Sequence, residues 1–156
     1  MADIKLFVMD VDGTLTDGKI HIGSNGEVMK SFNVKDGYGI AQILPKMGII
    51  PVIITGRASD IVSKRAEELG IKHVYQGVHN KLSQLKNLCE SLSVLPENIA
   101  YIGDDLNDIE CIEFCGYTAC PADAVGDVMR EVDYICTLNG GNGAVREFIE
   151  YLSDID

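Results

Sequence analysis

Short runs of apolar residues alternate with helix-like segments along almost the whole chain. The apolar runs predict strands at residues 5–9, 50–54, 73–75, 99–102, 117–119 and 134–136. The segments between and after them predict helices at residues 38–47, 59–69, 81–92, 106–114, 124–131 and 144–152. Runs that are apolar throughout, rather than at every second residue, indicate strands covered on both faces. The alternation therefore predicts an α/β fold with a doubly wound, Rossmann-like and mostly parallel sheet.

One segment departs from this alternation. Residues 19–22 and 28–32 flank the sequence Gly23-Ser24-Asn25-Gly26, which is typical of the turn of a β-hairpin. We therefore expect a small flap at about residues 17–32. Because no linker, internal repeat or low-complexity tract interrupts the rest, residues 1–156 are predicted to form a single domain.

Charge and composition argue against several classes of protein. The formal net charge of −11 argues against nucleic-acid binding, which requires clustered positive charge. No stretch approaches the roughly 18 apolar residues of a membrane span, and the first residues lack the basic region of a secretory signal. The five cysteines are odd in number and indicate reduced, buried thiols rather than disulfides. We predict a cytoplasmic protein with neither a nucleic-acid nor a membrane partner.

Polar and charged residues follow the predicted strands where the strands end. In an open α/β sheet, groups at the carboxyl ends of the strands gather at one edge. The groups expected there are Asp10 and Asp12 after the first strand, Thr55, Gly56 and Arg57 after the second, Lys81 after the third, and Asp104, Asp105 and Asp108 after the fourth. Singly, such residues are typical of turns, helix caps and solvated surface charges. Their joint occurrence at strand ends favours a catalytic site.

These residue types suit phosphoryl transfer. Carboxylates from two strand ends form a hard-oxygen site of the kind that binds Mg²⁺. Lys81 and the Thr55 hydroxyl would offset the charge on a phosphoryl group and its transition state. Asp10 is then placed to attack phosphorus, and Asp12 to protonate the leaving oxygen and later to activate water. Asp108 would hold the Lys81 ammonium in position.

The same residues resemble, in order, the four motifs of the haloacid dehalogenase-type phosphatases. The matching segments are Asp10-Val11-Asp12-Gly13-Thr14-Leu15-Thr16, Ile53-Ile54-Thr55-Gly56, Lys81 and Gly103-Asp104-Asp105-x-x-Asp108. The resemblance implies that Asp10 is the nucleophile and Asp12 the general acid and base. It also implies that the Asp10 carboxylate, the Asp12 backbone carbonyl and Asp104 bind Mg²⁺, and it leaves the role of Asp105 open.

A narrower resemblance, to the 3-deoxy-D-manno-octulosonate 8-phosphate phosphatases, covers essentially the whole chain. It rests on residues 32–39, 54–57, 74–77, 100–105 and 140–147. Those enzymes release 3-deoxy-D-manno-octulosonate (Kdo), the acidic sugar of bacterial lipopolysaccharide. The resemblance implies a substrate site that includes Asp12, Asn33, Val34, Lys35, Asp36, Gly37, Gly56, Arg57, Arg65 and Lys81. It also implies that the glycine-rich residues 140–143, together with the last segment of the chain, form a tail element that reaches an active site.

Two arginines bear on the choice of substrate. A sugar-acid phosphate carries a carboxylate as well as a phosphate and needs a further cation. Arg57 and Arg65 are about two helical turns apart, so we expect them to share one helix face. The similar 2-keto-3-deoxynononate 9-phosphate phosphatases carry an acidic residue after the Gly that Gly56 matches, so Arg57 favours the octulosonate. Ala41 stands where some relatives have a basic residue, which removes one possible contact.

The intervals between the motifs are too short for the cap domain that many members of the superfamily insert. An open site needs another wall, and the flap is the candidate. Its apolar residues Ile20, Ile22, Val28 and Phe32 would be exposed on a monomer, which indicates an association surface. As the resemblance also implies a homotetramer, we expect neighbouring subunits to wall each active site.

Three alternatives to a narrow Kdo 8-phosphate phosphatase stay open. The first is hydrolysis of 2-keto-3-deoxynononate 9-phosphate or of sugar phosphates more broadly. The second is a non-catalytic, oligomer-forming regulatory domain, which the complete set of motif residues disfavours. The third is a receiver-type signalling domain, whose phosphate-accepting Asp lies on the third strand. The third predicted strand ends in Gln76-Gly77 instead.

Overall fold

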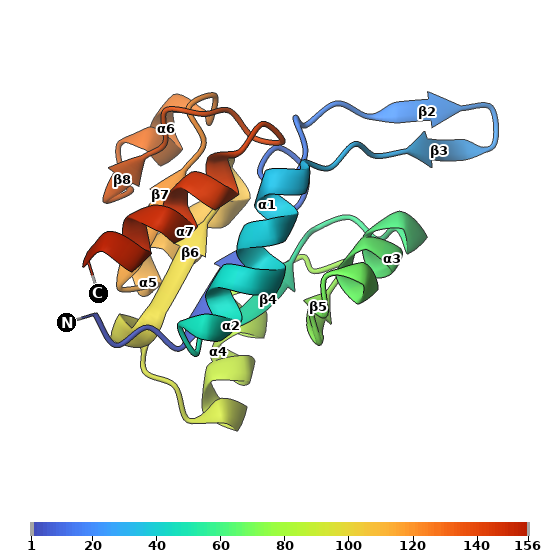
Figure 1. Ribbon diagram of the computed structural model, residues 1–156. Coiled ribbons are helices and arrows are strands. Elements are labelled where there is room, and N and C mark those ends of the chain that lie inside the picture. Colours follow the sequence, from blue (N-terminus) through green and yellow to red (C-terminus); the bar gives the residue numbers. More distant parts are fainter. Residues whose placement is uncertain (1, 156) are drawn as a thin grey trace.

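The computed structural model describes residues 2–155 and contains a six-stranded parallel sheet with helices on both faces (Figure 1). The strand order is β5-β4-β1-β6-β7-β8. The strands are β1 Leu6–Met9, β4 Ile50–Ile54, β5 His73–Tyr75, β6 Ile99–Ile102, β7 Tyr117–Cys120 and β8 Tyr134–Ile135. Every neighbouring pair is parallel, which confirms the predicted doubly wound α/β fold.

The helices follow the predicted segments but differ at several ends. They are α1 Val34–Tyr38, a π-helical turn Gly39–Ile43, α2 Leu44–Lys46, α3 Asp60–Glu68, α4 Lys81–Leu92, α5 Ile109–Phe114, α6 Gly126–Met129 and α7 Ala144–Ile155, with 3-10 turns at Pro96–Asn98 and Leu106–Asp108. The first helix starts earlier than predicted because the Asn33 side chain caps it, accepting a hydrogen bond from the backbone N–H of Lys35. Helix α6 is shorter than predicted, since Val125 before it is extended and offers no side-chain cap.

The flap is an antiparallel hairpin of β2 (His21–Gly23) and β3 (Gly26–Met29) that projects from the body of the molecule in Figure 1. Its strands are shorter than predicted, and a register shift between His21 and Ile22 interrupts their pairing. Ile22 is 73% exposed and Val28 is 64% exposed, as expected of an association surface. The prediction that Phe32 is exposed was wrong, because its ring packs against the hydrophobic core below α1.

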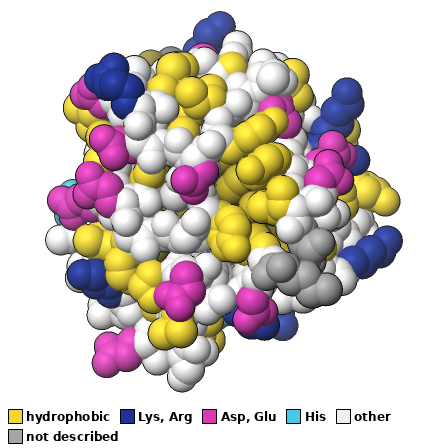
Figure 2. Space-filling view, turned by 90° about the vertical axis from the view of Figure 1, so that its left-hand side faces the viewer, with side chains coloured by type: hydrophobic (Ala, Val, Ile, Leu, Met, Phe, Trp, Pro, Cys, Tyr) yellow, Lys and Arg dark blue, Asp and Glu magenta, His cyan; other side chains and the backbone are white. Residues whose placement is uncertain are grey.

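Figure 2 shows the side of the molecule that lies at the left of Figure 1. Hydrophobic side chains gather near the centre of this face, and the Lys and Arg side chains lie apart from one another rather than in a band. Among residues 2–155, no helix combines the length and the apolar composition of a membrane span.

Successive residues of the central strands enter two separate cores, one on each face of the sheet. In β1, Phe7 and Met9 belong to the core beneath α1, α2, α3 and α7, whereas Leu6 and Val8 belong to the core beneath α4, α5 and α6. Strands β1 and β6 are buried at every residue. Because these two strands are held on both faces, the residues that follow them have well-determined positions.

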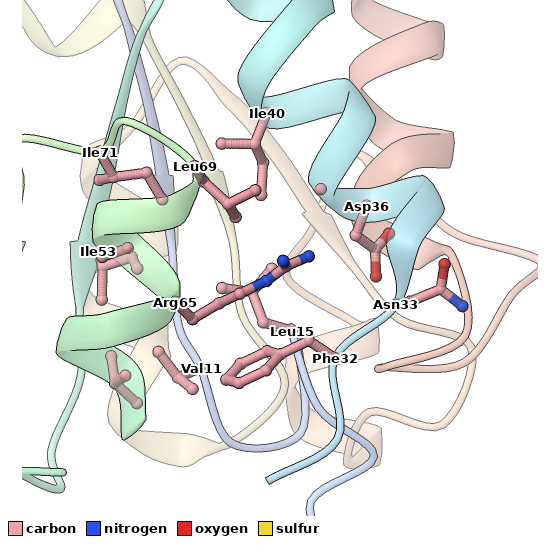
Figure 3. Close-up of a pocket in the computed structure, with 13 residues that line it drawn as sticks. Val11, Leu15, Phe32, Asn33, Asp36, Ile40, Ile53, Arg65, Leu69 and Ile71 are labelled. Atoms are coloured by element: carbon pink, nitrogen blue, oxygen red, sulfur yellow. The ribbon is translucent and has the colours of Figure 1, made fainter. Parts of the chain in front are cut away.

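The first core contains a cavity of about 10 Å³, which is room for about one water molecule (Figure 3). Apolar side chains form most of its lining, including Val11 and Leu15 from the loop after β1. Arg65 extends into this region from α3 toward α1, where Asp36 lies. The cavity therefore separates α3 from α1 directly behind the loop that carries Asp10 and Asp12.

Helix α7 should contribute strongly to stability through Phe148. This side chain is fully buried, and its ring centroid lies 5.5 Å from that of Phe7 in β1. We expect Phe148→Ala to lower the free energy of unfolding, measured by urea denaturation, by about 3–5 kcal/mol. As a control, Leu95→Ala at a 58% exposed position should change it by less than about 0.5 kcal/mol. Equal effects of the two substitutions would contradict this packing.

Candidate active site

The carboxyl ends of the central strands β4, β1 and β6 bring the predicted catalytic groups to one edge of the sheet. Asp10 follows β1, Thr55 follows β4 and Asp104 lies just beyond β6. Lys81 is the first residue of α4, which places its side chain at the same edge. The side chains of Asp10, Thr55 and Lys81 are all buried, although each is polar or charged. Burial of so many polar groups at one edge indicates a functional site.

Lys81 lies between two buried carboxylates. Its Nζ atom is 3.0 Å from Asp10 Oδ1 and 2.8 Å from Asp108 Oδ1. Burial acts to lower the pKa of Lys81, but the charges of Asp10 and Asp108 outweigh it and hold the pKa above its usual value. Lys81 is therefore a permanent ammonium that positions Asp10, and Asp108 holds that ammonium in place.

Asp108 also shapes the loop after β6. Its Oδ1 accepts a hydrogen bond of 2.6 Å from the Tyr101 hydroxyl, and its Oδ2 accepts bonds from the backbone N–H groups of Asp104 and Asp105. A Cβ on residue 103 would overlap the Asp108 carboxylate, so only Gly103 fits at this turn. Tyr101 was not predicted to be a site residue. The sequence signal for it was its hydroxyl, which is the polar side-chain group in the otherwise apolar run of residues 99–102.

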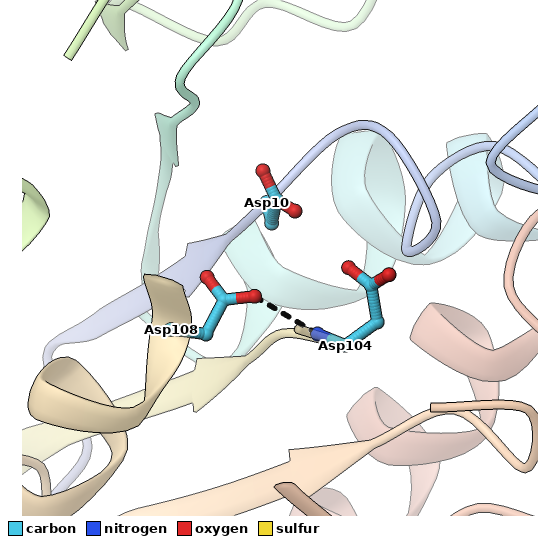
Figure 4. Close-up of side chains that lie close together, drawn as sticks. All are labelled: Asp10, Asp104 and Asp108. Atoms are coloured by element: carbon cyan, nitrogen blue, oxygen red, sulfur yellow. Dashed lines mark hydrogen bonds between the residues drawn. The ribbon is translucent and has the colours of Figure 1, made fainter. Parts of the chain in front are cut away.

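Asp10, Asp104 and Asp108 form a tight cluster of carboxylates (Figure 4), with one oxygen of each lying within 4.8 Å of the others. Burial and then the charge of Asp108 raise the pKa of Asp10. Burial and then the charge of Asp10 raise the pKa of Asp104 to about 8. Thr14 donates a hydrogen bond to Asp104 Oδ1 at 3.1 Å. The cluster thus concentrates negative charge that its neighbours only partly offset.

This arrangement fits a hard divalent cation such as Mg²⁺, which takes oxygen ligands and often only one or two carboxylates. Asp108 is close enough to be a ligand, but both of its oxygens already accept hydrogen bonds. Asp10 and Asp104 are therefore the better carboxylate ligands. A Cβ at residue 13 would overlap the Asp104 carboxylate, so Gly13 keeps this space free.

Asp12 faces the flap and takes part in a different set of contacts. Its Oδ1 accepts a hydrogen bond of 2.6 Å from the Lys30 ammonium, and its Oδ2 lies 4.0 Å from Arg57 Nε. Burial acts to lower the pKa of Lys30, but hydrogen bonds to Asp12 and Glu27 raise it overall. Sequence reasoning missed Lys30 and Glu27, because charged residues on a hairpin strand are usually solvated.

Arg57 does not share a helix face with Arg65, contrary to the prediction. Helix α3 begins only after the Ser59 cap, so Arg57 lies in the loop that follows β4. Its guanidinium is 3.6 Å from Glu27 and is half-exposed beside Asp12. A Cβ added at Gly56, which precedes Arg57, would come no closer than 3.8 Å to the Asn107 side chain and the Val78 carbonyl. Arg57 is thus open to a bound anion, whereas Arg65 belongs to another cluster.

The remaining predicted substrate residues lie on α1 and behind the flap. Asn33 caps α1, Val34 and Lys35 are exposed, and Asp36 accepts a hydrogen bond of 2.9 Å from the backbone N–H of Arg146 in α7. Arg65 stacks over Phe32 at 5.6 Å, pairs with Glu68 at 3.3 Å and abuts Gly37. Burial raises the pKa of Asp36 to about 6. Within residues 2–155, none of these contacts reaches Asp10 or Lys81.

The glycine-rich residues 140–143 contact the active-site loop of their own chain. The Gly141 N–H donates a hydrogen bond to the Thr14 carbonyl at 3.1 Å, and the Gly140 N–H donates one to Asp123 at 3.0 Å. A Cβ at Gly140 would overlap the Gly13 carbonyl. The tail element predicted from the sequence therefore supports the loop that carries Asp10 and Asp12.

The carboxylate cluster predicts proton release when a cation binds. Without a cation, the pKa of Asp104 is about 8, so this carboxyl is protonated at neutral pH. Cation binding must displace that proton, and Mg²⁺ affinity should therefore rise as the pH rises toward 8 and level off above it. Isothermal titration calorimetry at pH 7, in two buffers of different ionisation enthalpy, should show release of up to about one proton per Mg²⁺.

Asp104→Asn is the matched control for this measurement. It should weaken Mg²⁺ binding and abolish the release of the proton. An affinity that is the same at pH 6 and pH 9, with no proton released, would show that Asp104 is not protonated in the free protein.

Comparisons with known proteins agree with this geometry. A family model described as haloacid dehalogenase-like hydrolase matches residues 71–149. The 3-deoxy-D-manno-octulosonate 8-phosphate phosphatase KdsC of Escherichia coli (strain K12) is 47% identical over 150 residues, which cover 96% of this chain and 79% of that protein.

Two solved structures are similar over 98% of the chain. One is the 3-deoxy-D-manno-octulosonate 8-phosphate phosphatase of Moraxella catarrhalis in complex with magnesium, phosphate and KDO, with a TM-score of 0.94, 45% identity and 87% of that chain covered. The other is the cobalt-bound deoxy-D-mannose-octulosonate 8-phosphate phosphatase of Haemophilus influenzae, with a TM-score of 0.94, 38% identity and 89% covered. This chain therefore belongs to the haloacid dehalogenase-like hydrolases and, among them, to the family of 3-deoxy-D-manno-octulosonate 8-phosphate phosphatases.

Proposed function

We propose that this chain is a Mg²⁺-dependent phosphatase that hydrolyses Kdo 8-phosphate to Kdo and phosphate, a step toward lipopolysaccharide. The observation that carries the proposal is the Asp10 carboxylate, which lies buried 3.0 Å from the Lys81 ammonium and beside Asp104. The name of the Escherichia coli relative and the magnesium, phosphate and KDO bound to the Moraxella protein support both the substrate and the cofactor.

Asp10 and Asp12 divide the chemistry of the reaction. Asp10 attacks phosphorus, so that an aspartyl-phosphate forms while the bond from phosphorus to the sugar oxygen breaks. Asp12 gives a proton to the departing sugar oxygen and then accepts one from the water that hydrolyses the aspartyl-phosphate. Attack of this water releases phosphate and restores the Asp10 carboxylate.

Other residues stabilise the charge that develops on the phosphoryl group. Asp10, Asp104 and the Asp12 carbonyl would hold Mg²⁺, which would supply positive charge to offset that of the phosphoryl group. The Lys81 ammonium points to the same place, and the Thr55 hydroxyl is available as a hydrogen-bond donor at the adjacent strand end. Asp10, Thr55 and Lys81 are buried, so they act in an environment where electrostatic interactions are strong.

Arg57 is the proposed contact for the substrate carboxylate. It lies at the mouth of the site beside Asp12 and is half-exposed. Residues 33–37 and Arg65 lie behind the flap. We propose that they contact the substrate once neighbouring subunits have assembled around the site. The similar 2-keto-3-deoxynononate 9-phosphate phosphatases carry an acidic residue where this chain has Arg57. Because both substrates carry a carboxylate, it is this difference between the two families that favours Kdo 8-phosphate over the nine-carbon analogue.

We further propose a single catalytic domain that assembles into a homotetramer in the cytoplasm. Between β1 and β4 the described chain holds only the flap and the α1 to α2 segment, so a neighbouring subunit is the available wall for the site. The exposed apolar residues Ile22, Val28 and Met29 on the flap support such an association. Five free cysteines support a reducing compartment.

A panel assay tests the proposed substrate. Mg²⁺-dependent phosphate release should be fastest for Kdo 8-phosphate among sugar phosphates that include the nine-carbon analogue. Arg57→Met should raise KM for Kdo 8-phosphate about tenfold to a hundredfold, because a charge-assisted hydrogen bond is lost. It should leave KM for a phosphate ester without a carboxylate nearly unchanged. Equal rates across the panel would refute the narrow assignment.

Sedimentation tests the proposed assembly. The wild-type protein should sediment as a tetramer, and Ile22→Asp on the flap should dissociate it and reduce activity, since a buried charge opposes association. Leu95→Asp places the same charge at another exposed apolar position and should leave the tetramer intact. A wild-type monomer with undiminished substrate selectivity would overturn this part of the proposal.

A further inference from the structure

The flap contributes two charged residues to a closed ring of four alternating charges at the active site. Lys30 lies 2.6 Å from Asp12 and 3.0 Å from Glu27. Arg57 closes the ring, at 3.6 Å from Glu27 and 4.0 Å from Asp12. The ring therefore joins β3 and the residue after it to the loops that follow β1 and β4.

Lys30 is unusual for a residue on a hairpin. Its side chain is only 1% exposed, whereas Ile22 and Val28 on the same hairpin are mostly exposed. Glu27 is held from two further directions, by Arg57 and by the Ser59 hydroxyl at 3.1 Å. The position of the Lys30 ammonium is thus determined by the flap and by the cap of α3 together.

The contact with Lys30 leaves the two oxygens of Asp12 in different situations. Oδ1 accepts the short hydrogen bond from Lys30, while Oδ2 has only the more distant Arg57 beside it. A carboxylate held through one oxygen has one remaining oxygen with a defined direction for proton transfer. In the first step of the reaction, negative charge develops on Asp12 as its proton passes to the sugar oxygen, and an ammonium at Oδ1 stabilises that charge.

We propose that Lys30 is a positioning residue that orients Asp12 for proton transfer to the leaving group, and that the flap thereby takes part in catalysis. This inference rests on the proposed function, because it assigns Lys30 a role through the acid and base of that reaction. Lys30 itself forms no bond in the reaction. It holds Asp12 Oδ1, and Glu27 holds Lys30.

The test compares two leaving groups. The alkoxide of Kdo 8-phosphate must be protonated as it leaves, whereas the nitrophenolate of p-nitrophenyl phosphate is a stable anion that leaves without a proton. The ratio kcat/KM reports only on steps up to departure of this group. Lys30→Met should lower kcat/KM for Kdo 8-phosphate about a hundredfold, the size of a typical general acid contribution, and for p-nitrophenyl phosphate less than about fivefold.

Three further variants make the test specific. Lys30→Arg keeps the charge and should recover most of the activity on Kdo 8-phosphate. Lys19→Met is the same substitution at an exposed position of the flap and should leave kcat/KM unchanged for both substrates. In an Asp12→Asn background, Lys30→Met should lower kcat/KM by less than about twofold, because the residue through which it acts is gone.

The outcomes separate this inference from the proposed function. Wild-type protein that does not hydrolyse Kdo 8-phosphate overturns the proposed function. Wild-type protein that does, combined with equal losses on the two substrates in Lys30→Met, overturns the role of Lys30 alone. A further large loss from Lys30→Met in the Asp12→Asn background overturns it as well.

Discussion

The buried ammonium of Lys81 is the interaction on which the site depends. It lies between Asp10 and Asp108, at 3.0 and 2.8 Å, and it offsets part of the charge of three crowded carboxylates. Without it, burial and the charge of Asp108 would raise the pKa of Asp10 further, and a protonated Asp10 is a poor nucleophile. A single cation at the start of α4 therefore makes the cluster usable for chemistry.

Backbone packing holds this cluster in place. Gly103 allows the loop after β6 to wrap around Asp108, and Gly13 leaves room for Asp104. Gly140 and Gly141 press against the loop after β1 from the other side, and a side chain there would displace backbone atoms. The loops are short and supported on two sides, so the carboxylates meet with little freedom to move apart. That rigidity is what electrostatic stabilisation of a transition state requires.

The sequence predicted the fold and the catalytic cluster because both follow from strands. Fully apolar runs indicated a parallel sheet, and the ends of neighbouring parallel strands must meet, which placed Asp10, Thr55 and Asp104 together. The sequence was a poor guide to the direction of a side chain where that direction depends on the residue at which a helix begins. Arg57 and Arg65 were assigned to one helix face, but α3 starts after Arg57. Lys30 escaped notice because only the folded flap shows that its charge is buried.

The central claim is that Asp10 is the nucleophile, and reduction of the trapped intermediate tests it most directly. Borohydride reduces an acyl phosphate to an alcohol, so treatment during turnover of Kdo 8-phosphate should convert Asp10 to homoserine, which peptide mass spectrometry detects. The account predicts this conversion at Asp10 and at none of the other aspartates of the site. Conversion at another aspartate, or full turnover by an Asp10→Asn variant, would contradict it.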